Sequence, residues 1–247
     1  MLRPGRHFSR APGVPRGTAL AHDSNQEIWP AAVEAAQLVE DGMILGLGTG
    51  RAASMFVRQI ALRAEEGLSI RGVATSTKTE ELARSLAIPL VTLEEIERID
   101  LDVDGADEVS PNLDLIKGHG GALVREKVVA ACSKRLVILV GEEKLVPQLG
   151  ARVALPVEVV PFGMPLVRRE LEKLGRRVSL RLDGDSPFRT DNGNVILDVT
   201  VEGISLPAEL ERTIDAIPGV VDSGLFVGMT DLVLVQTDSG VRRLERS

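Results

Sequence analysis

Aromatic residues and cysteine are scarce in this 247-residue sequence. It contains no tyrosine, one tryptophan and five phenylalanines, so a buried core must be built from valine, leucine, isoleucine and alanine. The single cysteine, Cys132, cannot form an internal disulfide, which fits a reducing compartment. No apolar run approaches the roughly 20 residues needed to cross a bilayer. We therefore expect a cytoplasmic protein.

Basic residues are fewer than acidic residues in this sequence. The chain carries 29 Lys and Arg against 36 Asp and Glu, a formal net charge of −7. Nucleic-acid binding requires concentrated Lys and Arg, and anionic membranes attract basic surfaces, so we expect neither partner. At 247 residues the chain is long enough to bury a sizeable core as one large domain or two small ones.

The first 24 residues differ in composition from the rest of the chain. They hold four arginines, three prolines and no acidic residue before Asp23, and they lack the apolar segment of a secretory signal. An Arg-rich, acid-poor leader is compatible with a transit peptide. A disordered tail or a start codon placed too early fits better, so residues 1–24 are left out of the fold prediction.

Helical and strand-like patterns alternate between residues 25 and 150. Amphipathic stretches separate short apolar runs, and each run is typical of a strand. Helices are expected at 26–38, 52–64, 77–87 and 121–134, and strands at 43–47, 70–75, 88–93, 101–103 and 135–141. This alternation predicts an α/β fold with a Rossmann-like, mostly parallel sheet and helices on both faces.

The pattern changes after Gly150. Strands are expected at 156–160, 176–182, 190–202 and 220–227, and helices at 161–174 and 207–218. The order β-α-β-β-α-β predicts a smaller α+β, ferredoxin-like domain. A final hairpin, at 231–236 and 241–244, is assigned to the first domain. The predicted domains are therefore 25–150 together with 228–247, and 151–227.

A glycine-rich turn, Gly48-Thr49-Gly50, lies between a predicted strand and a predicted helix. Backbone N–H groups in such a turn can close on a phosphate, helped by the positive end of the helix. A dinucleotide site would need an acidic residue about 20 positions on, but the next strand ends at Thr75-Ser76. The turn therefore favours a phosphate or a phosphosugar over NAD. The alternative is a tight turn without a ligand.

Asp104 and Asp107 flank a Gly-Ala turn at the carboxyl end of a predicted strand, where open α/β sheets bind ligands. An Asx-turn is the alternative for one of them. Two aspartates with Glu108 beside them indicate contact with solvent or with a hydroxylated ligand. Aspartate-rich turns also hold Mg²⁺, but no histidine or further acidic cluster supports a metal, so we expect none.

Lys117 and Glu126 lie on either side of a glycine loop, residues 118–121, that leads into a predicted helix. A proton transfer beside a carbonyl needs a base, a cation for the developing oxyanion and carboxylates for hydroxyl protons, and this stretch supplies all of them. Alternatively, Glu126 is a solvated surface charge between Arg125 and Lys127. Lys144 follows the next strand on the same ligand side, or is a solvated loop lysine.

Five blocks of the sequence resemble, in order and spacing, ribose-5-phosphate isomerase of the A type. They are DVDGADEV, IKGHGGALVREK, LPVEVVPFG, TDNGNVILDV and AIPGVVDSGLFVG, and the resemblance runs from about Ala31 to Gln236. It implies a Rossmann-like domain with a ferredoxin-like lid that also serves in assembly, as a homodimer or homotetramer. It also implies cofactor-free interconversion of D-ribose 5-phosphate and D-ribulose 5-phosphate through a cis-enediol, in the non-oxidative pentose phosphate pathway.

The resemblance implies roles for individual residues. Glu126 matches the base that carries a proton between C1 and C2, and Lys117 matches the cation near the enediolate. Asp104 and Asp107 match the residues that assist ring opening and hydroxyl proton transfer. The expected substrate contacts are Thr49, Gly50, Arg51, Ala52, Gly105, Ala106, Gly118, His119, Gly120 and Lys144.

The sequence departs from the family pattern around the phosphate and in the glycine loop. Arg51 and Ala52 stand where the family has Ser-Thr, and His119 stands where it has glycine. Glu143 replaces a serine, and a helix lysine is replaced near Ile28. Each lost charged hydrogen bond costs ~1.5–3 kcal/mol. We hypothesise that Arg51 restores the missing cation by gripping phosphate bidentately, the alternative being an arginine that points to solvent.

Two other functions stay open. A phosphosugar-binding sensor on the same scaffold would bind its ligand with little turnover, although a sensor has no need of a base. An isomerase of another aldose phosphate would keep the catalytic residues and alter the phosphate loop. His119 is either tolerated in its loop or narrows the site.

Overall fold

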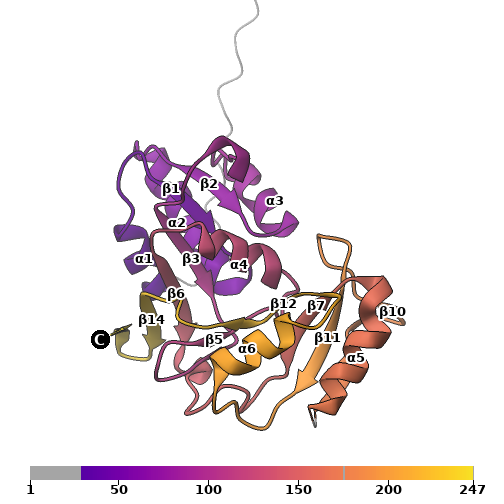
Figure 1. The fold of residues 1–247 in the computed structure, drawn as a ribbon. Helices are drawn as coiled ribbons and strands as arrows, with labels where there is room; N and C mark the ends of the chain where they lie inside the picture. The colour runs from indigo at the N-terminus through magenta and orange to yellow at the C-terminus, as the bar shows by residue number, and fades with distance from the viewer. Residues whose placement is uncertain (1–28, 175, 247) are drawn as a thin grey trace, which may run out of the picture.

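The computed structural model describes residues 29–174 and 176–246. The predicted leader and the departure near Ile28 lie outside the described residues. No helix within the two described stretches is long and apolar enough to cross a membrane. Figure 1 shows two groups of elements, with α1 to α4 around a large sheet and α5 and α6 beside a smaller one.

The large sheet has six strands in the order β15-β14-β6-β3-β1-β2. The five from β14 to β2 pair in parallel, and β15 is antiparallel to β14. The strand bounds are β1 (Ile44–Leu47), β2 (Arg71–Ala74), β3 (Leu101–Gly105), β6 (Leu136–Gly141), β14 (Leu232–Thr237) and β15 (Gly240–Glu245). The expected mostly parallel sheet is therefore confirmed. The chain runs outward in opposite directions from β1 and β3, and a ligand is expected where such strand order reverses.

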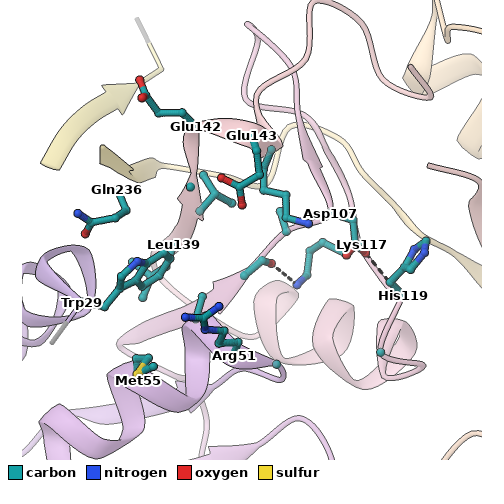
Figure 2. A pocket seen from close by; sticks show the side chains of 18 of the residues that line it. Trp29, Arg51, Met55, Asp107, Lys117, His119, Leu139, Glu142, Glu143 and Gln236 are labelled. Atoms are coloured by element: carbon teal, nitrogen blue, oxygen red, sulfur yellow. Dashed lines mark hydrogen bonds between the residues drawn. The ribbon is translucent and has the colours of Figure 1, made fainter. Parts of the chain in front are cut away.

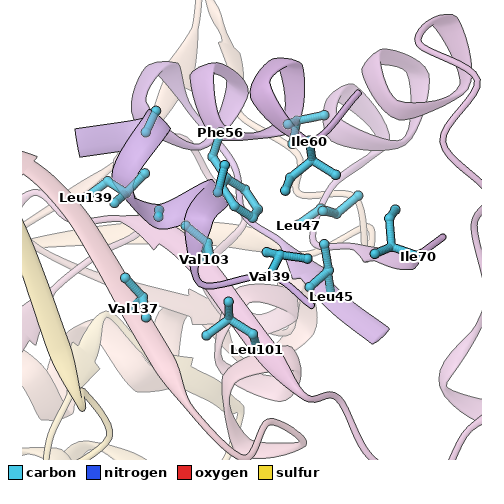
Figure 3. Close-up of a cluster of buried hydrophobic side chains, with 14 of the residues drawn as sticks. Val39, Leu45, Leu47, Phe56, Ile60, Ile70, Leu101, Val103, Val137 and Leu139 are labelled. Carbon is cyan, nitrogen blue, oxygen red and sulfur yellow. The ribbon is translucent and has the colours of Figure 1, made fainter. Parts of the chain in front are cut away.

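Helices cover both faces of this sheet. The helix bounds are α1 (Pro30–Gln37), α2 (Arg51–Glu65), α3 (Thr77–Ser85) and α4 (Leu123–Ala131). The buried side chains of α2 recur at helical spacing, and Phe56 and Ile60 pack on Leu45, Leu47 and Val103 (Figure 3). Neighbouring residues of a strand point to opposite faces, so α4 meets the other face of β3, which carries the aspartates.

The smaller sheet has the order β12-β7-β11-β8, and all its neighbouring strands are antiparallel. Its elements are β7 (Leu155–Val159), α5 (Met164–Lys173), β8 (Arg177–Leu180), β11 (Val195–Thr200), α6 (Pro207–Asp215) and β12 (Val220–Ser223). The order along the chain is the predicted ferredoxin-like one, so the fold class is confirmed. A core of valine, leucine and isoleucine joins the inner face of this sheet to both helices.

The expected strand at 88–93 is largely wrong. Only Leu90 forms a bridge, to Gly72 of β2. The backbone N–H and the hydroxyl of Thr92 both donate to the Glu95 carboxylate, which caps the short 3-10 helix η1 (Leu93–Glu95). This cap turns the chain away before a ladder can form.

The expected strand at 220–227 divides at Gly224. β12 ends at Ser223, and β13 (Leu225–Phe226) joins a separate sheet with β5 (Leu115–Ile116) and β4 (Glu108–Val109). A Cβ on Gly224 would lie 2.2 Å from the carbonyl oxygen of Lys117, so only glycine permits this close approach. The chain thus passes from β12 in the smaller sheet to β13, which pairs with β5, the strand that directly precedes Lys117. The remaining short elements are η2 (Glu142–Lys144), η3 (Pro161–Gly163), β9 (Leu182–Asp183) and β10 (Ser186–Pro187).

Candidate active site

A cavity of about 840 Å³ opens at the carboxyl ends of the parallel strands (Figure 2). Every predicted site residue except Asp104 lines it. The lining residues are Trp29, Pro30, Thr49, Gly50, Arg51, Ala52, Met55, Gly105, Ala106, Asp107, Lys117, Gly118, His119, Gly120, Glu126, Leu139, Val140, Gly141, Glu142, Glu143, Lys144, Gln236, Thr237 and Asp238. The structure therefore brings together six segments of the sequence, at 29–30, 49–55, 105–107, 117–126, 139–144 and 236–238.

The ammonium of Lys117 lies between two carboxylates. Its Nζ is 2.9 Å from Asp104 Oδ2 and 3.2 Å from Glu126 Oε2. It also donates to the carbonyl oxygen of Gly105 at 2.6 Å. Lys117, Asp104 and Glu126 are only 3%, 1% and 4% exposed, so the three charges share one desolvated space. Glu126 is therefore not the solvated surface charge of the alternative interpretation.

Asp104 lies beneath the cavity floor because two turns close over it. Its Oδ1 accepts from the backbone N–H of Thr49 at 3.0 Å and of Gly105 at 2.7 Å. A Cβ on Gly48 would lie 2.2 Å from the same oxygen, so glycine is required directly after β1, beside its neighbouring strand β3. The local bond to Gly105 is what the Asx-turn alternative described, but the carboxylate also joins the two turns and pairs with Lys117.

Asp107 faces the cavity and fixes the glycine loop. Its Oδ2 accepts from the backbone N–H of His119 at 2.9 Å (Figure 2), while the His119 residue as a whole is exposed. Gly118 has a φ of 106°, and a Cβ there would come within 2.8 Å of Leu123 Cβ. Glycine at this position lets the loop turn directly into α4, which carries Glu126 in its first turns.

The buried charges shift one another's proton affinities. Burial raises the pKa of Glu126 to about 8, although Lys117 works against the shift. Burial also raises the pKa of Asp104 despite the same lysine. For Lys117, burial lowers the pKa, but the charges of Asp104 and Glu126 outweigh it and the net shift is upward. The lysine therefore stays charged, and Glu126 can exchange a proton near neutral pH.

Another part of the cavity wall is formed by the glycine turn at the start of α2. Gly50, with a φ of 105°, precedes α2, whose first residue is the exposed Arg51. The hydroxyl of Thr49 contacts those of Thr75 and Ser76, each at 2.8 Å. These hydroxyl groups stand where a dinucleotide site would carry an acidic residue. Within residues 29–174 and 176–246, no group of three or more His, Cys, Asp or Glu is arranged to hold a metal ion.

The sequence interpretation missed several lining residues, among them Trp29, Met55, Glu142 and Gln236. Gln236 is the penultimate residue of β14, and its Oε1 accepts from the backbone N–H of Ala31 at 3.1 Å. The rule that ligands gather at carboxyl ends of parallel strands would have found it, once β14 was paired with β6. No comparable signal marked Trp29, which is the N-cap residue directly before α1.

Comparison with known proteins agrees with this geometry. The model of the ribose 5-phosphate isomerase A (phosphoriboisomerase A) family matches residues 71–240. The ribose-5-phosphate isomerase A of Thermomicrobium roseum is 55% identical over 219 residues, which cover 88% of this chain and 92% of that protein. The protein of the same name from Gloeobacter violaceus is 52% identical over 218 residues, which cover 88% and 95%.

Solved structures agree as well. Ribose 5-phosphate isomerase A from Methanocaldococcus jannaschii superposes with a TM-score of 0.84 at 44% identity, covering 87% of this chain and 96% of that one. A D-ribose-5-phosphate isomerase in complex with phospho-erythronic acid superposes with a TM-score of 0.85 at 40% identity, with the same coverage of 87% and 96%. Fold and sequence agree over nearly all of the described chain, which belongs to the ribose 5-phosphate isomerase A family.

Proposed function

We propose that this protein interconverts D-ribose 5-phosphate and D-ribulose 5-phosphate through a cis-enediol, using no metal or cofactor. The observation that carries the proposal is the pair formed by Glu126 and Lys117, 3.2 Å apart at the wall of the cavity. A carboxylate base and an ammonium are the two groups that proton transfer beside a carbonyl requires. A relative at 40% identity was solved with phospho-erythronic acid, which supports a sugar-phosphate ligand here.

In the proposed mechanism Glu126 removes the C2 proton of the open-chain aldose. The C2 electron pair forms the C1–C2 double bond, and negative charge develops on O1. The ammonium of Lys117 stabilises that charge. The proton then moves from Glu126 to C1. The hydroxyl proton of O2 is transferred to the oxyanion O1, so that O1 becomes a hydroxyl group and the carbonyl forms at C2. Each proton that leaves carbon returns to carbon, and no oxidant or reductant is consumed.

The two aspartates have different parts in this proposal. Asp107 lines the cavity, so we assign it to ring opening and to the transfer of hydroxyl protons. Asp104 does not line the cavity and holds Lys117 at 2.9 Å from below. We propose that Asp104 acts through Lys117, by keeping the ammonium charged and in place, rather than by touching the sugar.

The phosphate end is proposed to lie at the start of α2. The Thr49 N–H is bonded to Asp104, so the backbone N–H groups from Gly50 onward and the positive end of α2 favour an anion there. Arg51 and Lys144 line the same cavity and supply side-chain cations. The remaining expected contacts also line the cavity: Ala52, Gly105, Ala106, Gly118, His119 and Gly120.

We further propose a cytoplasmic homodimer or homotetramer. Three apolar side chains of the ferredoxin-like region are strongly exposed: Phe162 at 96%, Leu206 at 64% and Leu182 at 56%. Apolar surface of this kind favours an interface between copies. Light scattering of the purified chain measures its mass, and a monomer of 26.5 kDa at micromolar concentration would exclude this assembly.

Glu126→Gln keeps the size of the side chain and removes the base. We expect kcat for ribulose 5-phosphate formation to fall by ~10²–10⁴, because that is the usual contribution of a positioned base. The assay follows the ketose with EDTA present, beside Glu172→Gln in the exposed part of α5 as a matched control. Wild-type binding without turnover would instead identify a sensor. Turnover of another aldose phosphate, but not of ribose 5-phosphate, would show that the enzyme has a different substrate from the one proposed.

The raised pKa of Glu126 predicts a rising pH profile. Only the ionised carboxylate removes a proton, so kcat/KM is expected to increase with pH and to level off above about 8. The slope approaches tenfold per pH unit only well below the pKa, so the rise from pH ~7 to ~9 is about tenfold in all. The test is to measure initial rates at low substrate concentration between pH ~7 and ~9. The substrate phosphate titrates near ~6, so its charge hardly changes over this range. A flat profile over this range would contradict an elevated pKa.

Arg51→Ala tests the compensation at the phosphate. We expect KM for ribose 5-phosphate to rise roughly tenfold with kcat within about twofold, because a charged hydrogen bond of ~1.5–3 kcal/mol is lost from ground state and transition state alike. Arg58→Ala, on the same helix but outside the cavity lining, is the control. An unchanged KM in Arg51→Ala would refute the hypothesis.

A further inference from the structure

One arginine of the ferredoxin-like region grips the glycine loop without lining the cavity. Arg181 lies between β8 and β9. Its Nε donates to Asp198 Oδ2 at 2.9 Å and its Nη2 to Asp198 Oδ1 at 2.5 Å. Its Nη1 donates to the carbonyl oxygens of Gly118 at 2.8 Å and His119 at 2.9 Å. Four hydrogen bonds therefore join one guanidinium to a strand of one sheet and to the loop beside Lys117.

The Gly118 and His119 carbonyl groups bound by Arg181 determine the direction in which the N–H groups of the loop point. In a trans peptide the C=O and the following N–H point in opposite directions, and no described peptide bond is cis. The N–H groups of His119 and Gly120 therefore face away from Arg181. The His119 N–H meets Asp107 Oδ2 at 2.9 Å on the cavity side, as this requires. Gly120 also lines the cavity, and a Cβ on it would lie 3.9 Å from Thr49 Cγ2.

The glycine loop, residues 118–121, would adopt many conformations if no other part of the chain bound it. Gly118 and Gly121 have φ values of 106° and 84°, and glycine reaches such values about as easily as negative ones. The region of Arg181 touches the loop a second time, because a Cβ on Gly121 would lie 2.4 Å from Phe188 Cζ. The side chain of Arg181 is 13% exposed, so its hydrogen bonds are largely shielded from water.

We propose that Arg181, oriented by Asp198, is a positioning residue for isomerisation: it holds the glycine loop so that its N–H groups and Lys117 face the reacting end of the sugar. The inference rests on the proposed function for its kinetic consequence, but not for its structural one. Only arginine has the planar fork that binds one carboxylate with two N–H groups and keeps further donors for two carbonyls. The proposed phosphate contacts come from other segments, so we expect Arg181 to affect the chemical step more than the binding of the phosphate.

The test compares Arg181→Gln and Arg181→Lys with wild type and with Arg177→Gln, whose arginine is exposed on the adjoining strand β8. We expect Arg181→Gln to lower kcat about tenfold or more with KM changed less than about threefold, since small misplacement of reacting groups is costly. Arg181→Lys keeps the charge but not the fork, so most of the loss remains. Arg177→Gln should match wild type.

Hydrogen exchange provides a readout that does not depend on turnover. In Arg181→Gln the peptide that spans residues 117–123 should exchange faster, while peptides of β7 and β11 keep wild-type protection. Unchanged kcat and loop exchange in Arg181→Gln would overturn the proposal. So would faster exchange throughout the ferredoxin-like sheet together with full recovery of kcat in Arg181→Lys, because the arginine would then be only a structural link. Absence of wild-type turnover would refute the proposed function, and loop exchange would still decide the role of Arg181.

Discussion

The buried ammonium of Lys117 is the contact on which the shape of the cavity depends. An ionised lysine loses its hydration when it is buried, and it is stable there only with charged and hydrogen-bonded partners. Asp104, Glu126 and the Gly105 carbonyl supply them at 2.9, 3.2 and 2.6 Å. Asp104 can reach Lys117 only because Gly48 leaves room above it. The turn after β1 holds Asp104 in place, and the end of β3 presents the Gly105 carbonyl, so both segments contribute to the partners of the lysine.

The helix that carries Glu126 is held from both sides by the ferredoxin-like region. Arg125 donates from Nε to Asn192 Oδ1 at 2.9 Å, and the amide nitrogen of Asn192 donates to the buried Glu158 at 3.1 Å. On the other flank Lys127 pairs with Asp222 at 2.5 Å. The residues before and after Glu126 are thus anchored to the second sheet, while Glu126 itself faces Lys117. The run Arg125-Glu126-Lys127 is therefore not a solvated patch. Arg125 and Lys127 bind the ferredoxin-like region, and Glu126 pairs with Lys117.

The sequence was sufficient for the parts of the site that depend on local chemistry. Glycine and aspartate at strand ends indicated the turns at Thr49 and Asp107, and alternation of helices and strands indicated both sheets. Directions were harder to predict. Whether Asp104 faces the ligand or lies beneath the cavity floor depends on how closely the turn after β1 approaches the end of β3, which no residue pattern reveals. Strands of two residues, such as β4, β5 and β13, have no detectable period, so the three-stranded sheet that they form was missed.

The contacts across the two regions were out of reach for a related reason. Arg181 and Gly118 are 63 positions apart, and nothing in the sequence indicates that they touch. Likewise, the end of β14 became part of the cavity only through its pairing with β6. Patterns within a segment predict its conformation, whereas the partners of a long polar side chain depend on the packing of the whole chain.

The scarcity of aromatic residues gives the cavity an optical label. Trp29 is the only tryptophan of the sequence, there is no tyrosine, and the indole lines the cavity near Met55 and Leu139 (Figure 2). Indole emission responds to the polarity and charge of its surroundings. The intrinsic fluorescence of the unmodified protein therefore originates at the cavity, and it can report the arrival and departure of a ligand in real time without an attached dye.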